Sequence, residues 1–244
     1  MVYQIDAHCK RLLWIGKERT IESFSRFFDL MGADFCQGLR YVCSDMWKGH
    51  LEVVRRRVPQ AVHVLDRFHI VANLNKALDE IRAAEARRLR LGGDSETLKH
   101  TRWCLLKRTK NLTRKQCGRL RELLSMNLRT GRAYLLARDF QHLWEYTSPT
   151  WAGKFLDLWC RTAMRSRLDP SKKIARQLRS HRALILNYFR AKKMFSSGVV
   201  EALNNNAKLS IRKAYGFRTF TALEVALFHQ LGQLPEPPLT HKFW

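Results

Sequence analysis

Acidic residues are scarce in this sequence. Only 21 Asp and Glu face 45 Lys and Arg in 244 residues, which gives a formal net charge of +24 at pH 7. A foldable chain with so large an excess of one sign repels itself unless an acidic partner compensates it. Nucleic acid is the obvious polyanion, because each phosphate that Lys or Arg neutralises releases bound counterions. The charge balance therefore favours a protein that handles nucleic acid.

Long hydrophobic runs and paired cysteines are also missing. No apolar run approaches the roughly 18 residues of a membrane-spanning helix, and no signal peptide precedes the first charged residues. We therefore expect a cytoplasmic protein with no membrane partner. The cysteines form no Cys-x-x-Cys pair, and no histidines cluster to complete a zinc site with them. Reduced thiols are expected at Cys9, Cys36, Cys43, Cys104, Cys117 and Cys160.

The first 70 residues have a mixed pattern of strands and helices. Short apolar runs at Val2 to Ile5 and Leu12 to Ile15 predict two adjacent strands. Helical spacing from Ile21 to Met31 predicts a covering helix that stops at Gly32. Hydrophobic residues make up 45% of the chain, which is enough for a packed core in one domain with a large insertion or in two small domains.

Two further strands of this region end in aspartates. A run from Leu39 to Cys43 leads into Asp45, and a run from Ala61 to Leu65 leads into Asp66. A helix that Pro59 terminates connects them. The pattern thus predicts an aspartate at the carboxyl end of each of two strands.

From Ile70 onward the spacing of apolar residues is helical, and no strand signal reappears. Residues 71–190 are predicted to be entirely helical. In the last segment, Thr221 and Glu224 form a Thr-x-x-Glu pattern that predicts a capped helix ending at Gly232.

Positive charge is concentrated in two segments. Residues 86–132 carry 14 Lys and Arg against 3 acids, and residues 167–218 carry 13 against 2, so each stretch has a net charge of +11. These segments are the best candidates for phosphate contact. Trp103 lies in the first segment and could stack on unpaired bases, although core packing is the favoured interpretation of a single tryptophan.

Carboxylates are the groups that could carry chemistry on DNA. Phosphoryl transfer requires clustered carboxylates that hold two divalent cations about 4 Å apart, and Mg²⁺ prefers hard oxygen ligands. Asp45 and Asp66 suit this role because ligands gather at the carboxyl ends of strands. From the local pattern alone, however, helix capping is the favoured interpretation of both.

Glu201 and His69 are the remaining candidates. Glu201 is one of only two acids in a 52-residue basic segment and follows the apolar pair Val199 and Val200. The alternative is a solvated glutamate paired with a nearby lysine. His69 could carry a proton or orient a ligand, but a lone histidine after a strand is more often structural.

As a set, these residues resemble a known family. The matching motifs are Ser44-Asp45-Met46, Pro59 to His69 with the sequence PQAVHVLDRFH, Val200 to Lys208 with VEALNNNAK, and Arg212 to Arg218 with RKAYGFR. Together they resemble the ISL3 family of DDE transposases over about residues 1–231. The combination of Asp-Arg-Phe-His, Glu-x-Leu-Asn-Asn and Tyr-Gly-Phe-Arg is specific.

The resemblance implies an α/β fold in which a ribonuclease-H-like core, a mixed sheet with helices, is interrupted by a large all-helical insertion. It divides the chain into a partial core (1–70), the insertion (71–190), returning core helices (191–232) and a loose tail (233–244). It identifies Asp45 as the second triad aspartate and Glu201 as the triad glutamate, with Asp66 and His69 as a signature beside the site. Whether Asp45 or Asp66 is the second metal ligand stays open.

The resemblance also implies cofactors and partners. The family reaction uses two Mg²⁺ or Mn²⁺ ions to cleave DNA at transposon ends and to join them to target DNA. Homo-oligomerisation on DNA stays open, and the protein is expected to associate with the bacterial nucleoid. The basic residues expected to contact DNA are Arg102, Lys107, Arg108, Lys208, Arg212, Lys213 and Arg218.

The sequence departs from the family at its beginning. It starts in what resembles the second core strand, so the strand that supplies the first aspartate is not seen, and neither are the zinc-ribbon and helix-turn-helix regions. We therefore expect a truncated chain that binds DNA but lacks strand transfer. The alternatives are a non-enzymatic DNA-binding remnant and a basic RNA-binding structural protein, and the latter leaves the motifs unexplained.

Overall fold

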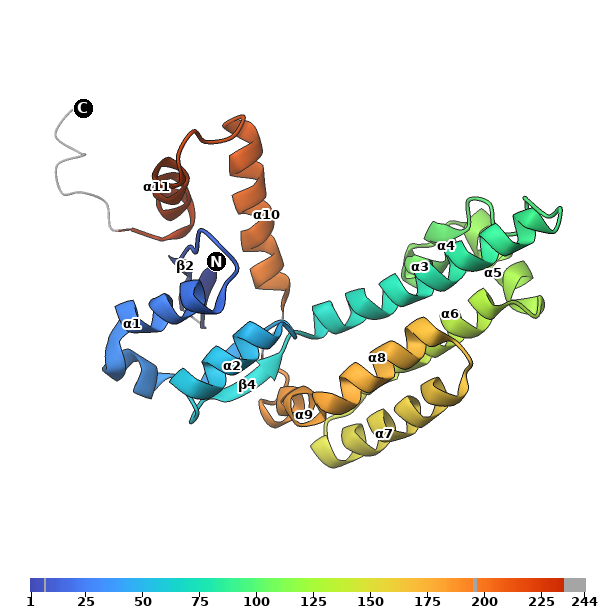
Figure 1. The fold of residues 1–244 in the computed structure, drawn as a ribbon, viewed down its shortest axis with the longest axis horizontal. Helices are drawn as coiled ribbons and strands as arrows, with labels where there is room; N and C mark the ends of the chain where they lie inside the picture. Colours follow the sequence, from blue (N-terminus) through green and yellow to red (C-terminus); the bar gives the residue numbers. More distant parts are fainter. Residues whose placement is uncertain (7, 195–196, 235–244) are drawn as a thin grey trace. The chain divides into compact units, whose positions relative to one another are not determined.

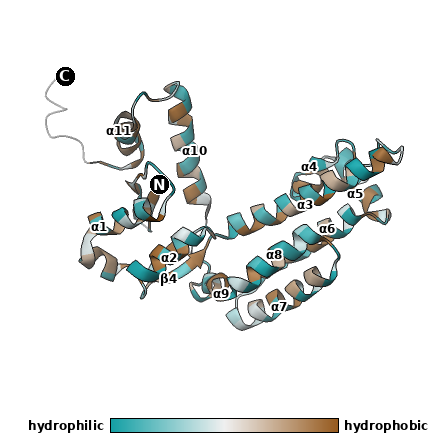
Figure 2. Ribbon diagram, viewed as in Figure 1, coloured by the Kyte–Doolittle hydropathy of each residue, from teal (hydrophilic) through white to brown (hydrophobic). Residues whose placement is uncertain are grey.

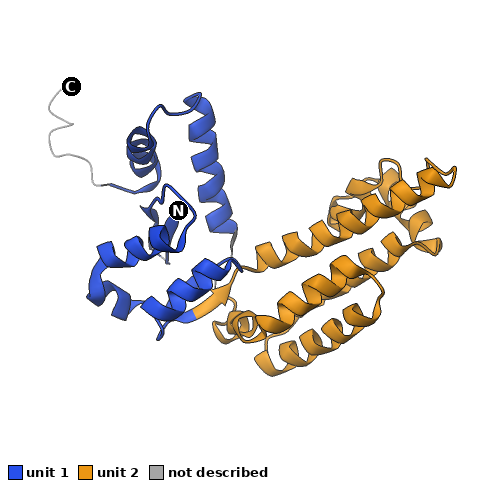
Figure 3. Cartoon of the chain, in the orientation of Figure 1, with its two compact units in different colours: residues 1–62, 195–244 blue, residues 63–194 orange. Residues whose placement is uncertain are grey.

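The computed structural model describes residues 1–6, 8–194 and 197–234. These residues divide into two compact units, one formed by residues 1–62 with 195–244 and the other by residues 63–194 (Figure 3). Short strands and helices of the first unit precede the helices of the second along the chain, and two further helices return to the first unit (Figure 1). The fold is therefore mixed α/β with a helical majority.

Unit 1 begins with an antiparallel hairpin. Strand β1 (Val2–Ile5) pairs with β2 (Lys10–Trp14), with Tyr3 opposite Leu12 and an irregularity between Val2 and Tyr3. Asp6 stabilises the connecting turn, because its carboxylate accepts hydrogen bonds from the backbone N–H groups of His8 and Cys9. The expectation that the chain opens in paired strands is confirmed.

Helix α1 (Ile21–Gly38) does not stop at Gly32, contrary to the sequence-based expectation. Gly32 has φ of 80°, a left-handed conformation that glycine adopts at little cost, and the helix resumes beyond it. The glycine therefore produces a kink. Before the kink, Phe27 and Phe28 of α1 pack in one core with Val53 of α2 (Lys48–Arg57).

Strands β3 (Tyr41–Ser44) and β4 (Val62–Leu65) form a second two-stranded sheet, and the border between the units falls within β4. The described residues thus form two separate strand pairs rather than one continuous mixed sheet. Both strands lie close to their predicted positions.

The returning helices complete unit 1. Helix α10 (Ser197–Lys213) and helix α11 (Phe220–Leu231) pack on β2, where Leu12, Ala207 and Leu227 share one core. The cap of α11 is Thr219, whose hydroxyl accepts from the Ala222 N–H, so the prediction of a capping box at Thr221 was wrong by two residues. This core joins the start of the chain to its far end.

Unit 2 is helical beyond β4, as predicted, with both hydrophobic and hydrophilic residues distributed along its helices (Figure 2). A long helix, α3, packs against α6 and α8, and α7 packs against α8 and α9. The helices are α3 (Arg67–Leu91), α4 (Arg102–Leu106), η1 (Thr109–Asn111), α5 (Arg114–Ser125), α6 (Arg129–Asp139), η2 (Phe140–Glu145), α7 (Pro149–Arg165), α8 (Asp169–Ser180) and α9 (Arg182–Arg190).

A buried carboxylate holds two of these helices together. Glu85 of α3 is only 3% exposed, and its carboxylate accepts from the backbone N–H groups of Arg129 and Thr130 at 3.0 and 2.7 Å. Those N–H groups begin α6 and have no partner within that helix. A negative charge at a helix N-terminus is also favoured by the helix dipole.

The remaining structural expectations concern cysteines and membrane spans. All six cysteines are free thiols, with Cys104 and Cys160 buried and Cys43 exposed. Within the described residues, no helix is both long enough and apolar enough to cross a membrane. The predicted loose tail falls largely on residues 235–244, which lie outside the described residues.

Candidate functional site

Asp45 lies directly after β3, in the turn that leads into α2. Its Oδ1 accepts from the Trp47 backbone N–H at 3.1 Å and lies 2.7 Å from Nδ1 of His50. Its Oδ2 accepts from the guanidinium of Arg19 at 2.5 Å. The first oxygen is thus held by the local chain, and the second by a side chain from before α1.

The surroundings of Asp45 keep it ionised. Burial by itself raises the pKa of this carboxyl group, because it disfavours the charged form. The hydrogen bonds from His50 and the Trp47 N–H, with the charges of His50 and Arg19, outweigh burial and lower the pKa to about 2. Asp45 is therefore a carboxylate at physiological pH.

Arg19 is the exposed member of this cluster. Its side chain is 61% exposed, against 18% for Asp45 and 25% for His50. Its guanidinium lies 5.1 Å from the centroid of the Trp47 ring, a cation–π contact. Sequence reasoning missed all three neighbours of Asp45. Trp47 and His50 follow it closely, but no sequence signal connects Arg19 with it.

Asp66 and His69 lie at the start of α3 in unit 2. Asp66 is the N-cap of this helix, because its Oδ1 accepts from the Phe68 N–H at 2.9 Å. Its Oδ2 lies 2.8 Å from Nδ1 of His69. The capping interpretation is therefore confirmed for Asp66, and the Asp-x-x-His signature brings the two side chains into direct contact.

Glu201 is an exposed residue near the start of α10. Within the described residues, its carboxylate has no ion pair or hydrogen bond, so the alternative of a glutamate paired with a nearby lysine is not what the structure shows. One turn later, Oδ1 of Asn204 accepts from the Tyr3 hydroxyl at 2.8 Å. Burial raises the pKa of Tyr3 to about 12, so this donor stays protonated. The contact ties β1 to the helix that carries Glu201.

A metal site with three or more protein ligands is not found among the described residues, where no three His, Cys, Asp or Glu side chains cluster to hold an ion. Asp45 and Glu201 both belong to unit 1, but each has a different environment. Asp45 is bound by Arg19 and His50, whereas Glu201 is exposed to solvent. That the two carboxylates share a site stays a prediction.

The predicted DNA contacts fall in both units. In unit 2, Arg102 begins α4 and pairs with Asp79 at 3.0 Å, so its charge is partly compensated. Lys107 and Arg108 are exposed in the turn after α4. Trp103 is 56% exposed beside Arg102, so the core-packing interpretation was wrong for this tryptophan. In unit 1 the exposed cations on α10 and the turn after it are Lys208, Arg212, Lys213 and Arg218.

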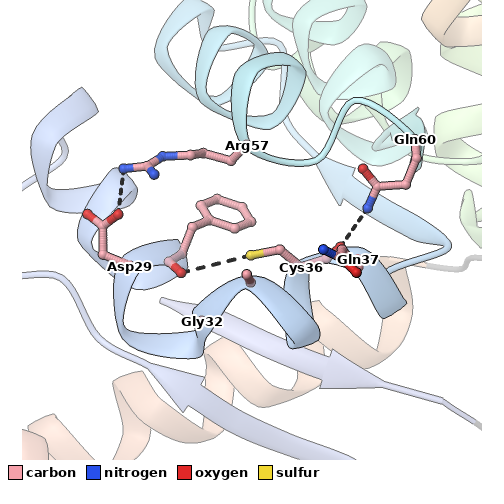
Figure 4. Close-up of a pocket in the computed structure, with 8 residues that line it drawn as sticks. Asp29, Gly32, Cys36, Gln37, Arg57 and Gln60 are labelled. Carbon is pink, nitrogen blue, oxygen red and sulfur yellow. Dashed lines mark hydrogen bonds and ion pairs between the residues drawn. The ribbon is translucent and has the colours of Figure 1, made fainter.

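A separate hollow of about 390 Å³ lies beside the kink of α1 (Figure 4). Gly32 faces it, the Asp29 to Arg57 ion pair spans 2.6 Å on one side, and Gln60 donates to the Cys36 carbonyl oxygen on the other. None of the predicted site residues lines this hollow. It is therefore distinct from the candidate site.

Comparison with known proteins defines the class to which these features belong. A family model described as a transposase matches residues 1–227. The chain is 32% identical to the transposase for insertion sequence element IS1001 of Bordetella parapertussis, over 88% of this chain and 53% of that protein. It is 28% identical to the transposase for insertion sequence element IS1557 of Mycobacterium tuberculosis, over 97% of this chain and 58% of that protein.

These matches define the class as the transposases of insertion sequences. The chain belongs to the ISL3 family of DDE transposases, which confirms the resemblance found in its motifs. The chain spans about half the length of the curated relatives it matches. No solved structure matches it significantly.

Proposed function

We propose that this chain forms part of the catalytic core of an insertion-sequence transposase, which cleaves DNA at the ends of a mobile element and transfers the freed 3′ ends to target DNA. The observation that carries the proposal is the state of two carboxylates in one compact unit. Asp45 is held ionised at the end of a strand, and Glu201 is exposed and unpaired among the described residues. Family membership over residues 1–227 supports it.

Asp45 and Glu201 are the proposed ligands of Mg²⁺ or Mn²⁺, because both offer hard carboxylate oxygens. When bound, the ions would activate the attacking oxygen and stabilise the leaving oxygen. Oδ1 of Asp45 is anchored by His50 and the Trp47 N–H, which orient the carboxylate. Oδ2 is bound by the exposed Arg19, so it is the oxygen that a cation reaches once Arg19 turns away.

Asp66 and His69 are not among the proposed metal ligands. Both carboxylate oxygens of Asp66 are used within the first turn of α3, one by a backbone N–H and one by His69. An oxygen that caps a helix is lost to the helix when it binds a metal, and losing such a cap costs about 1 kcal/mol. We therefore favour Asp45 over Asp66 as the second ligand.

The proposal also assigns a part of the family's organisation to each unit. We propose that unit 1 is the ribonuclease-H-like core and that unit 2 is the helical insertion that interrupts it. Unit 1 is discontinuous in sequence, and its core packs Leu12 against Leu227, as expected when a segment is inserted between two parts of one domain.

The DNA-binding part of the proposal rests on charge. The chain has a net charge of +24, and Lys107, Arg108 and the cations of α10 are exposed. Binding of duplex DNA should weaken steeply between low and moderate salt and depend little on sequence, because phosphate contacts release counterions and read no bases. A binding titration at several salt concentrations tests this, and affinity independent of salt contradicts it.

The metal site is tested by titrating the chain with Mn²⁺ in a calorimeter. We expect Asp45→Asn and Glu201→Gln each to weaken Mn²⁺ binding at least ten-fold, and Arg19→Ala to strengthen it because it frees Oδ2. Glu22→Gln removes an exposed carboxylate of α1 and is the matched control. If Glu201→Gln and Arg19→Ala both bind Mn²⁺ as tightly as the native chain does, the proposed metal site is contradicted.

A cleavage assay on transposon-end DNA distinguishes the proposed catalytic function from a non-enzymatic one. The alternative is a protein that binds DNA without cutting it, which the compensation of Asp45 by Arg19 favours. Metal-dependent cleavage that Glu201→Gln abolishes supports the transposase site, whereas binding without cleavage in every condition supports the alternative. The expectation that the chain alone lacks strand transfer stays a prediction, and the same assay tests it.

A further inference from the structure

A turn joins α10 to α11 (Figure 1), and it contains the aromatic residue Tyr215. The side chain of Tyr215 is fully exposed, at 101% of its reference area. Its φ is 52°, and that of Gly216 is 94°. The Tyr215 N–H donates to the Arg212 carbonyl, and the Gly216 N–H donates to the Ile211 carbonyl at 3.0 Å. This is the pattern of a helix end closed by a left-handed residue, a position that glycine usually occupies.

Tyrosine is a costly choice at this position. A side chain in the left-handed region brings Cβ close to the following carbonyl oxygen, and only glycine avoids the penalty. Packing does not compensate the penalty, because the Tyr215 ring makes no aromatic or hydrogen-bonding contact with another described residue. Five other described non-glycine residues also have a positive φ, so it is the combination of this strain with a fully exposed phenol ring that points to a ligand.

The surroundings of Tyr215 indicate the chemistry of that ligand. Arg212 and Lys213 precede it and Arg218 follows it, and all three are exposed without an ion pair among the described residues. No acidic residue occurs in the sequence between Glu201 and Glu224. An aromatic ring flanked by uncompensated cations suits a polyanion that also has flat apolar faces. Nucleic acid has both, since phosphates and bases alternate along each strand.

We propose that Tyr215 is a base-stacking residue, which binds an unpaired base of DNA while Arg212, Lys213 and Arg218 contact the adjoining phosphates. A base inside an intact duplex is already stacked on both faces, so a single exposed ring gains most at a frayed end, a bulge or a single-stranded stretch. The proposal rests on the DNA-binding function proposed above and adds a preference for unpaired DNA. It assigns to Tyr215 a role that its neighbouring cations do not have.

The test compares two DNA probes of equal length, a fully paired duplex and the same duplex with a two-nucleotide bulge. Fluorescence anisotropy measures the affinity of the full chain and its variants for each. We expect Tyr215→Ala to weaken binding of the bulged probe about ten-fold, which lies within the range for one base stacked on an aromatic side chain. Binding of the paired probe should change less than two-fold. Tyr215→Phe keeps the ring and should bind as the native chain does.

Two further variants separate stacking from a structural role. Tyr215→Gly relieves the left-handed strain, so it should raise the melting temperature while still losing the preference for the bulged probe. Trp151→Ala is the matched control. It removes an exposed tryptophan of unit 2 whose ring centroid lies 4.4 Å from Nζ of Lys154. It should leave both affinities unchanged.

The outcomes distinguish this proposal from the broader one. If the native chain binds neither probe, the DNA-binding function itself fails. If it binds both probes and Tyr215→Ala lowers both affinities equally or neither, DNA binding stands and the stacking role is overturned. Tighter binding of an RNA strand of the same sequence than of the bulged DNA also overturns the assignment to DNA.

Discussion

The two units differ in how completely they bury their large side chains. Among the described residues, ten of the twelve largest fully buried side chains lie in unit 2, including Trp159 and Phe140, and the other two, Leu12 and Leu227, lie in unit 1. Unit 1 instead has small separate cores, one around Leu12 and one around Phe27 and Phe28. We infer that the helical unit contributes most of the chain's stability.

The candidate chemistry has the opposite distribution. Asp45 and Glu201 both lie in the unit with the smaller cores. A carboxylate that binds a cation must be partly open to solvent, and a DNA-binding turn must be exposed, so neither adds to a hydrophobic core. The helical unit uses its most buried carboxylate, Glu85, for structure alone. Stability and chemistry are thus separated between the units.

The largest effect is expected from a core substitution in unit 2. Trp159 is 1% exposed, and its indole N–H donates to the Leu136 carbonyl at 2.9 Å. Trp159→Ala should lower the free energy of unfolding by about 3–5 kcal/mol, because it leaves a cavity and removes the hydrogen bond from the indole N–H. Denaturant unfolding followed by circular dichroism measures the change. Trp151→Ala, at a site 59% exposed, is the control, and equal losses in the two variants would contradict the assignment of the core.

A somewhat smaller effect is expected at the buried carboxylate of the same unit. Glu85→Ala leaves the N–H groups of Arg129 and Thr130 without their acceptor. Hydrogen bonds to a charged group contribute about 1.5–3 kcal/mol, so unit 2 should lose about 2–3 kcal/mol in the same unfolding experiment. The control is Glu122→Ala, which removes an exposed carboxylate paired only with Arg119. We expect the control to change stability by less than about 0.5 kcal/mol.

Much of the fold could be predicted from the spacing of apolar residues. The strands near Val2 and Leu39 and the helices beyond Ile70 were predicted because a period of two or of 3.6 residues is a local property. The end of α1 was mispredicted because Gly32 is compatible with both a stop and a kink. The helix resumes where Phe35 and Cys36, beyond the kink, pack against the core around Phe27, Phe28 and Val53, which is a tertiary contact.

The candidate site was only partly accessible from the sequence. Motifs identified Asp45 and Glu201, but not the state of either side chain. The neighbours of Asp45 include Arg19, which lies 26 residues earlier and comes close only through folding. The contact of Tyr3 with Asn204 spans 201 residues and has no periodic signal. The exposure of Tyr215 could not be predicted either, because a tyrosine at a helix end can equally pack inward.

Acid should destabilise unit 1 through Asp45. Folding lowers the pKa of its carboxyl group from the ordinary value of 3.8 to about 2, so the folded state favours the ionised form. This contribution is fully present above pH 3.8 and is lost as the pH falls toward 2. It amounts to about 2 kcal/mol, given that one pKa unit corresponds to about 1.4 kcal/mol.

Stability curves of the native chain and Asp45→Asn between pH 6 and 2 measure this contribution. The two curves should converge at low pH, because the asparagine does not titrate. A difference that stays constant over the whole range would contradict the role of the Asp45 charge.

The smallest effect concerns the hydrogen bond that joins the two ends of unit 1. The Tyr3 hydroxyl donates to Oδ1 of Asn204 at 2.8 Å, one turn from Glu201. Tyr3→Phe removes this bond and should cost about 1 kcal/mol. Because the folded pKa of Tyr3 is raised from 10 to about 12, the contribution is present below pH 10 and is lost as the pH rises through 12.

A double-mutant cycle with Asn204→Ala isolates this bond from other effects of each substitution. If the bond stabilises unit 1, the two single losses should sum to more than the loss in the double variant by about 1 kcal/mol. Additive losses would show that the hairpin and α10 are held together by hydrophobic packing and not by this bond. The same variants should weaken Mn²⁺ binding slightly, since a looser α10 positions Glu201 less well. A change in stability with unaltered Mn²⁺ affinity would separate the packing of unit 1 from its proposed metal site.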